Sequence, residues 1–261
     1  VAFQNAADFA RERLQGRSIT GAKAPDKPAD PIIVHPDVRR MLMDMKSFTE
    51  GARAFTYWTA LQGDLLHVSP DAHVREKADD RMALLTPVIK GFLTDRGFKC
   101  ASDALQLHGG TGYTLDQGVE QFVRDARIAL IYEGTNGIQA LDLVGRKLAA
   151  NGGRAVFGFF SDLEEFVSEN EANEKMKPYV EGVRSATAQL KEATMWLMQN
   201  GMSNFDNAGA SSHDYLQLFG LTALALMWAK MAKAALAKEA SGDRFYSDKL
   251  ATARYYFDRV L

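Results

Sequence analysis

Residues 106–148 read QLHGGTGYTLDQGVEQFVRDARIALIYEGTNGIQALDLVGRKL, and this stretch decides the fold. Its apolar residues recur at three- and four-residue steps, which is the period of an amphipathic helix. Glycines divide it into the end of one helix, a helix over about 117–131, a short turn that holds Glu133, and a helix over about 136–149. Helices joined by tight turns indicate an antiparallel bundle.

The same helical period extends upstream of this stretch. It predicts helices over 2–15, about 37–67 and about 71–108. Residues 16–36 hold four of the seven prolines and are predicted to form a long loop. Pro87 lies inside the third helix, so we expect a kink or an interruption there. Strand signals are nearly absent, so the sequence predicts an all-α fold in which residues 1–150 form a four-helix, up-and-down bundle.

Residues 151–261 are predicted to form a second helical bundle. The boundary falls at Asn151 and the two glycines that follow it, because the glycine motifs stop there. We expect a capping box at Ser161 to begin a helix, and a polar loop over 200–213. The segment 214–240 is hydrophobic on nearly all sides, so we expect it at the centre of this bundle.

Composition narrows the classes of partner. The 261 residues are 46% hydrophobic and 25% charged, and the net charge of -2 gives no electrostatic reason to expect nucleic acid or an anionic membrane. One cysteine, Cys100, excludes an intramolecular disulfide and a cysteine zinc site, and fits a reducing, cytoplasmic compartment. The apolar run 216–231 is too short and interrupted for a membrane span. Because the chain begins with Val1, we expect it to be part of a longer protein.

Three glycines, Gly109, Gly110 and Gly112, can be read in two ways. Glycine adopts positive φ and lets the backbone approach a ligand closely, and the free amides of such a loop can bind an anion. The same residues are typical of a helix C-cap followed by a turn, which is the reading that the glycines alone favour. From the residues alone, both readings stay open.

The other candidate residues also have both a functional and an ordinary structural interpretation. Glu133, bounded by glycine, can act as a base if a bound substrate excludes water, or be an ordinary solvated glutamate. Arg11, Arg13 and Arg17 can hold a phosphate, or they can be solvent-exposed side chains at the end of a helix. The five histidines show no metal-ligand spacing, and the GxSxG motif of serine hydrolases does not occur.

Two of these motifs together resemble the acyl-CoA dehydrogenase family. Gln106 to Tyr113 matches its Q-x-x-G-G-x-G-Y segment, and Tyr132 to Thr135 matches its Y-E-G-T segment, in the right order and separation. Residues 9–17, FARERLQGR, resemble the family's arginine-bearing segment. Residues 151–261 resemble, in length, position and helical pattern, the added helical domain of the subgroup that includes 3-methylmercaptopropionyl-CoA dehydrogenase.

The resemblance implies an FAD-dependent enzyme of fatty acid metabolism that introduces a Cα–Cβ double bond into an acyl-CoA. It places Glu133 as the base that takes the α-proton, while a hydride passes to FAD. It also implies a set of flavin contacts: Arg13 and Gln15 on the phosphates, Thr135 on the adenosine part, and Gln106, Gly109 and Gly110 beside the FAD of a neighbouring subunit. Two positions depart from the pattern, since Gly137 replaces a frequent glutamine and Gly16 directly follows Gln15.

The resemblance also implies partners and leaves two alternatives. Electron-transfer flavoprotein is the expected electron acceptor, and a homo-oligomer, dimer or tetramer, is the expected assembly. An acyl-CoA oxidase uses the same glutamate but gives its electrons to oxygen, so hydrogen peroxide formation distinguishes it. The other alternative is a helical oligomerisation module that is inactive as an isolated fragment.

Overall fold

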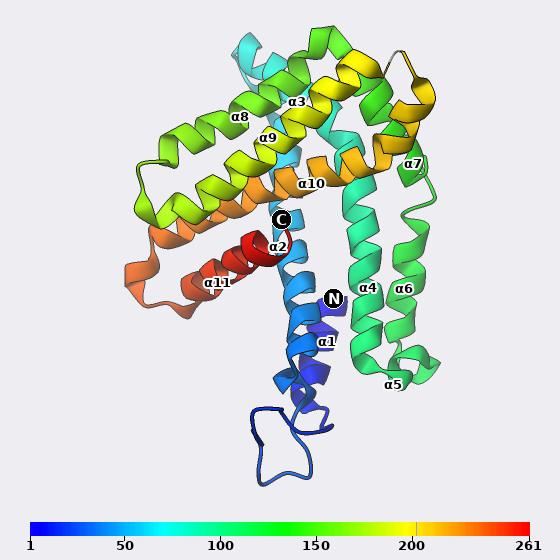
Figure 1. The fold of residues 1–261 in the computed structure, drawn as a ribbon, viewed down its shortest axis with the longest axis vertical. Helices are drawn as coiled ribbons and strands as arrows, with labels where there is room; N and C mark the ends of the chain where they lie inside the picture. Colours follow the sequence, from blue (N-terminus) through cyan, green and yellow to red (C-terminus); the bar gives the residue numbers. More distant parts are fainter. Residues whose placement is uncertain (202) are drawn as a thin grey trace. The chain divides into compact units, whose positions relative to one another are not determined.

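The structure is a computed structural model that describes residues 1–201 and 203–261 (Figure 1). Its regular elements are helices, and no strand occurs among these residues. An isolated antiparallel bridge joins Leu14 to Pro31. The all-α prediction is therefore confirmed.

The chain forms two compact units. The first unit comprises Val1–Thr49 and Thr94–Tyr132, and the second comprises Glu50–Leu93 and Glu133–Leu261. This grouping differs from the one predicted from the sequence, since the Asn151 boundary lies inside the second unit. The domains 1–150 and 151–261 remain a prediction about which parts of the chain fold independently.

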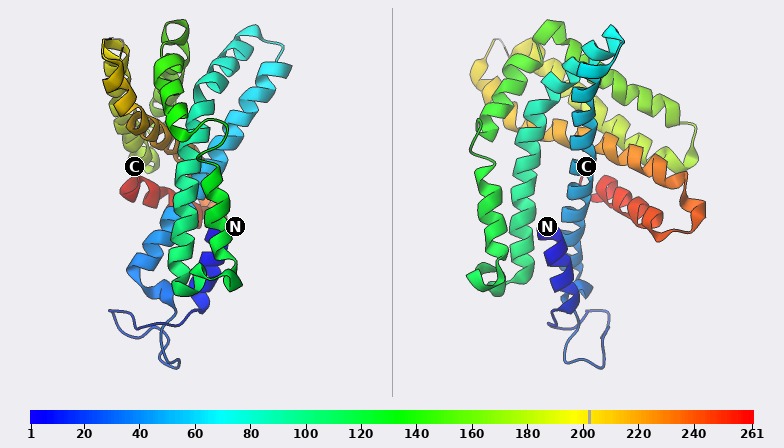
Figure 2. Two further views of the ribbon diagram at one scale, coloured as in Figure 1. Left: turned by 90° about the vertical axis from the view of Figure 1, so that its right-hand side faces the viewer. Right: turned by 180° about the vertical axis from the view of Figure 1, so that it is seen from behind.

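The first unit contains four helices longer than one turn and a short one. These are α1 (Ala2–Glu12), the beginning of α2 (Pro36–Val68), α4 (Thr94–His108), α5 (Gly110–Tyr113) and α6 (Val119–Ile128). Its core joins small and flexible side chains: Ala6, Ala7, Ala10, Ile32, Met41, Leu42, Met45, Ala104 and Leu107. Helices α4 and α6 lie side by side with α5 at the end that connects them (Figures 1 and 2).

The second unit contains the remainder of α2 and the later helices. They are α3 (Ala72–Val88), α7 (Asn136–Asp142), α8 (Arg154–Asn170), α9 (Lys177–Asn200), α10 (Phe205–Leu236) and α11 (Arg244–Arg259), with π-helical turns η2 (Ile89–Leu93) and η4 (Leu143–Lys147). Short 3₁₀ turns complete the chain: η1 (Ile32–Val34), η3 (Leu115–Gln117), η5 (Ala150–Gly153), η6 (Glu174–Met176) and η7 (Glu239–Ser241). Helices α8, α9 and α10 lie side by side, and α11 packs on α10 (Figure 1).

Helix α10 is the core of the second unit, as its sequence predicts. Side chains on all of its faces are buried, including those of Tyr215, Phe219 and Trp228. It is the one helix in the described part of the chain that is long and apolar enough to cross a membrane by those two criteria. However, 67% of its apolar window is buried within the protein, which is also the situation of a core helix.

Several helix boundaries agree with the sequence and two do not. The expected interruption near Pro87 is confirmed, because α3 ends at Val88 and η2 follows. The capping box at Ser161 is wrong, since α8 begins seven residues earlier and the Ser161 hydroxyl donates to the Phe157 carbonyl within the helix, at 3.1 Å. The polar loop predicted over 200–213 is also wrong in its extent, because Asn204 caps α10, which begins at Phe205. Residue 202 of that expected loop lies outside the described residues.

Candidate functional site

The predicted site residues divide between the two units. Arg13, Gln15, Gln106, Gly109 and Gly110 belong to the first unit, and Glu133 and Thr135 belong to the second. The two groups are therefore described in turn.

The backbone of the arginine-bearing segment is fixed by the start of the next element. Arg13 ends α1, and its carbonyl accepts the N–H of Ile32 at 2.8 Å. The N–H of Gln15 donates to the Asp30 carbonyl, and the Asp30 N–H donates to the Gly16 carbonyl, both at 2.9 Å. These backbone hydrogen bonds hold Arg13 and Gln15 in a short extended segment, and the side chains of both residues are exposed.

Asp30 organises the long loop that follows this segment. Its side chain is fully buried, and its carboxylate accepts the N–H groups of Ser18, Lys23 and Ala24 at 2.7–2.9 Å. The Arg17 guanidinium adds a contact at 3.2 Å. Led by the bond from Ser18, these donors overcome the opposing effect of burial and lower the pKa of Asp30 to about 2. The loop over 16–36 is thus a closed structure built on one carboxylate.

The structure separates the three arginines by their partners. Arg11 pairs with Asp8 at 2.8 Å. Arg17 is used within the loop, where it donates to the carbonyls of Ala24 and Lys27 as well as to Asp30. In the part of the chain that the structure describes, no group forms an ion pair or hydrogen bond with the side chain of Arg13. Arg13 is therefore the arginine of this segment that can offer its planar donors to a phosphate.

Glycine stands at the three positions after α4 for different structural reasons. Gly109, between α4 and α5, has φ +62°, a conformation that favours glycine. A methyl group at Gly112 meets the Leu105 carbonyl at 2.9 Å and His108, so packing requires glycine there. At Gly110, by contrast, φ is negative and a methyl group meets nothing within 4 Å. Packing within the chain does not explain Gly110, whose exposed backbone leaves room for a ligand to approach.

Gln106 lies on the exposed side of the last turn of α4, with its carbonyl accepting the N–H of Gly109 at 3.0 Å. On the opposite side of this turn His108 is buried, stacks on Phe9 at a centroid distance of 4.3 Å, and contacts the Ala104 carbonyl at 2.7 Å. The buried side fixes the turn, and its exposed side presents Gln106 and Gly110 to solvent.

In the second unit, Glu133 is exposed and has an unusual backbone. Its φ is +56°, in the left-handed region, and Gly134 follows at +81°. Thr135 then caps α7, with its hydroxyl oxygen accepting the N–H of Ile138 at 3.4 Å. A residue with a side chain is disfavoured in this conformation, and such positions cluster at functional sites.

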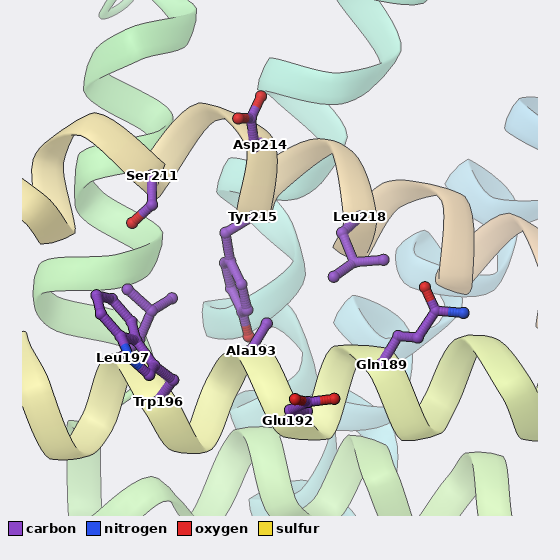
Figure 3. A pocket seen from close by; sticks show the side chains of 9 residues that line it. All are labelled: Gln189, Glu192, Ala193, Trp196, Leu197, Ser211, Asp214, Tyr215 and Leu218. Carbon is purple, nitrogen blue, oxygen red and sulfur yellow. The ribbon is translucent and has the colours of Figure 1, made fainter.

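A separate groove of about 630 Å³ lies between α9 and α10 (Figure 3). Trp196, Leu197 and Leu218 give it apolar walls, and the carboxylates of Glu192 and Asp214 lie on its two helices. The Tyr215 hydroxyl at its floor is bonded to Thr194 at 2.7 Å. None of the predicted site residues lines this groove, so it is not part of the candidate site.

The chemistry of the predicted residues fits a phosphate-bearing cofactor and a proton-transfer reaction. In the first unit, Arg13 supplies an unpaired cation and Gly110 supplies open backbone. In the second, Glu133 presents a carboxylate from a constrained turn. The chain is therefore an all-helical protein with exposed groups that can hold a phosphate and accept a proton.

Comparison with known proteins identifies the family. Residues 2–148 match the family model described as acyl-CoA dehydrogenase, C-terminal domain, and residues 159–261 match the one described as acetyl-CoA dehydrogenase C-terminal like. The chain therefore belongs to the acyl-CoA dehydrogenase family, and the resemblance drawn from its motifs is confirmed.

Two relatives and one solved structure extend this finding. The 3-methylmercaptopropionyl-CoA dehydrogenase of Ruegeria pomeroyi is 37% identical across 100% of this chain and 44% of that protein. The broad-specificity linear acyl-CoA dehydrogenase FadE5 of Mycobacterium tuberculosis is 32% identical, across 99% and 44%. An acyl-CoA dehydrogenase from Bacillus anthracis, complexed with FAD, has the same fold with a TM-score of 0.73, 19% identity, and coverage of 98% and 42%. The chain thus spans less than half the length of these relatives.

Proposed function

We propose that this chain is the C-terminal helical part of an FAD-dependent acyl-CoA dehydrogenase. Family membership and the full-length similarity to two dehydrogenases support this function. The single observation that carries the catalytic assignment is Glu133, an exposed glutamate at φ +56° in a turn closed by Gly134 and Thr135. A strained position of this kind persists only where the surrounding structure holds it.

Glu133 removes the α-proton of the acyl thioester. That proton is only weakly acidic, so its removal needs a carboxylate within hydrogen-bond reach and stabilised charge on the thioester oxygen. FAD, when bound, accepts a hydride from the β-carbon. The balanced result is a Cα–Cβ double bond, one proton on Glu133, and one hydride, which carries the two electrons, on the cofactor.

The cofactor contacts follow the exposed groups in each unit. Arg13 and Gln15 would hold the phosphates of FAD, and Thr135 would contact its adenosine part. Gln106, Gly109 and Gly110 would lie beside the FAD of a neighbouring subunit. The unpaired side chain of Arg13 and the unobstructed backbone at Gly110 support these roles.

We also propose a cytoplasmic homo-oligomer, dimer or tetramer, that passes its electrons to electron-transfer flavoprotein. The lone cysteine supports a reducing compartment. Exposed apolar side chains support self-association, among them Tyr113 and Leu115 in the first unit, at 79% and 80% exposure.

The catalytic assignment is tested in the whole protein with Glu133→Gln. This change keeps the shape of the side chain and removes the proton acceptor, so turnover should fall by roughly a hundredfold to ten-thousandfold. Turnover is measured with a panel of acyl-CoAs and an artificial electron acceptor, and bound FAD is measured by its absorbance. FAD content should be unchanged.

The matched control is Glu181→Gln, at an exposed glutamate on α9. It should keep full activity. Near-normal turnover in Glu133→Gln contradicts the assignment, and hydrogen peroxide formed in proportion to turnover identifies an oxidase instead.

A further inference from the structure

The strained conformation of Glu133 raises the question of what holds it. A non-glycine residue does not remain in the left-handed region unless neighbouring groups keep it there. The backbone carbonyl of Glu133 accepts a hydrogen bond from the side-chain amide of Gln139, whose Nε2 lies 3.2 Å away. Gln139 lies on α7, six residues later, and is half-buried.

Gln139 is itself fixed by close packing. A methyl group at Gly134 lies 3.0 Å from Nε2 of Gln139, so the side-chain amide lies directly against the turn. At its other end, the Cβ atom of Gln139 packs over Gly91 of η2, 3.5 Å from where a methyl group at Gly91 projects. Gly134 therefore leaves space for the Gln139 amide, while the contact between Gln139 and Gly91 is an ordinary van der Waals contact.

Asn136 ties the same turn to η2. It is buried, with 7% of its surface exposed, and it begins α7. Its amide donates to the Gly91 carbonyl at 3.1 Å, and its oxygen accepts from Nζ of Lys90 at 2.7 Å. π-Helical turns such as η2 are rare and are frequently found at functional sites.

We propose that Gln139 and Asn136 are positioning residues for the base Glu133. Gln139 holds the backbone of Glu133 in its left-handed conformation, and Asn136 fixes the start of α7 to η2. Together they place the Glu133 carboxylate relative to a rigid element before the substrate binds. The inference rests on the proposed function, because it assigns a reason for the rigidity of that one glutamate.

Proton transfer depends on the position of the Glu133 carboxylate, so the hydrogen bonds that hold its turn affect the rate. Proton transfer requires reacting atoms at about 3–3.5 Å, and a displacement of about 1 Å costs up to about a hundredfold in rate. A glutamate side chain has three rotatable bonds, so a backbone that also moves spreads the carboxylate over many positions. Holding the backbone removes its contribution to this spread.

The functional arm of the test uses Gln139→Met in the whole protein. Methionine has the length and flexibility of glutamine but no N–H, so it removes the bond to Glu133 and keeps the packing over Gly91. We expect kcat to fall about tenfold with KM within about twofold of the parent and FAD content unchanged. The limb of the pH–kcat profile that reports the base should also shift. Gln199→Met, at an exposed position on α9, is the matched control and should change none of these.

The structural arm needs no activity and uses amide hydrogen exchange in this chain. Residues 133–139 should exchange about fivefold faster in Gln139→Met than in Gln199→Met, because one hydrogen bond that opposes local opening is lost. Asn136→Asp keeps the acceptor for Lys90 but removes the donor to the Gly91 carbonyl, and it should accelerate exchange in the same residues.

The two arms separate the possible failures. Unchanged exchange in both variants contradicts the claim that Gln139 and Asn136 hold the turn, whatever the activity. Faster exchange with unchanged kcat and pH profile overturns the positioning role. If Glu133→Gln remains active, the proposed function itself fails, and the exchange data still decide whether the turn is clamped.

Discussion

Asp30 is a buried carboxylate that the first unit surrounds with hydrogen-bond donors rather than with water. Three backbone N–H groups and the Arg17 guanidinium are its partners. The loop they close lies directly against the backbone of Arg13 and Gln15. The proposed phosphate contacts therefore depend on a residue that does not touch the cofactor.

The low pKa of Asp30 makes its contribution to stability depend on pH. Its pKa is about 2 in the folded protein and near 3.8 when unperturbed, so the unfolded chain binds the proton more readily. The stabilisation is complete above about pH 4 and is lost as the pH falls from 3.8 to 2. We expect Asp30→Asn to lower the urea midpoint of unfolding at neutral pH, and this difference from the parent to shrink toward pH 2.

The control for this prediction is Asp26→Asn, at an exposed aspartate in the same loop. It should leave the urea midpoint close to that of the parent. Equal effects of the two substitutions, or a difference for Asp30→Asn that does not shrink toward pH 2, contradict the role assigned to Asp30.

The sequence motifs pointed to candidate site residues but not to the residues that hold their backbone. Glu133 and Gly110 stand in short motifs with fixed neighbours, which is why the resemblance pointed to them. Asp30, Gln139 and Asn136 act through contacts 6 to 46 positions along the chain. An aspartate in a proline-rich loop carries no local mark that it will be buried.

At the scale of elements, α10 shows what an apolar helix needs from its neighbours. Gly220 interrupts an otherwise apolar sequence, and in isolation it weakens the helix. In the structure a methyl group at Gly220 overlaps the ring of Phe92 in η2. The glycine allows close packing between α10 and the π-helical turn, which also carries Gly91 and Lys90.

Two glycine substitutions should therefore have opposite effects on stability. Gly220→Ala should lower the free energy of unfolding by about 1–3 kcal/mol through overpacking against Phe92. Gly158→Ala, inside α8, meets nothing within 4 Å and should raise it by about 1 kcal/mol, the difference in helix propensity. Chemical denaturation of both variants and the parent measures this. A stabilised Gly220→Ala contradicts the packing.

Helix ends were predicted less well than helices. The apolar side chains of Val183, Leu190 and Leu197 recur at helical spacing on α9 and are all buried. The start of α8 was misplaced because Gly153, at φ +85°, begins the helix without a side-chain cap. Arg154 then forms ion pairs with Glu76 and Asp80 of α3. Contacts between helices, rather than a local capping pattern, set that boundary.

At the scale of the whole molecule, the proposed contacts with FAD are divided. Arg13, Gln106 and Gly110 belong to one unit and Thr135 to the other, and the chain spans 44% of its relatives' length. The chain has its own cores in both units, so we expect it to fold alone. We assign its residues to the phosphates and the adenosine part of FAD. We assign none of them to a pocket for the flavin ring.

We therefore expect the isolated chain to self-associate and to bind FAD weakly. Exposed apolar side chains in each unit, such as Leu115 in the first and Ile138 in the second, at 80% and 54% exposure, favour association with another copy. Weak binding of FAD follows because a partial set of contacts does not offset the free energy needed to order the cofactor. The purified chain is mixed with FAD and passed over a sizing column with light-scattering detection, and flavin absorbance and mass are recorded together. A dimer or larger species with little flavin is the expected result, and a monomer that elutes with stoichiometric FAD would show that these helices alone suffice to hold the cofactor.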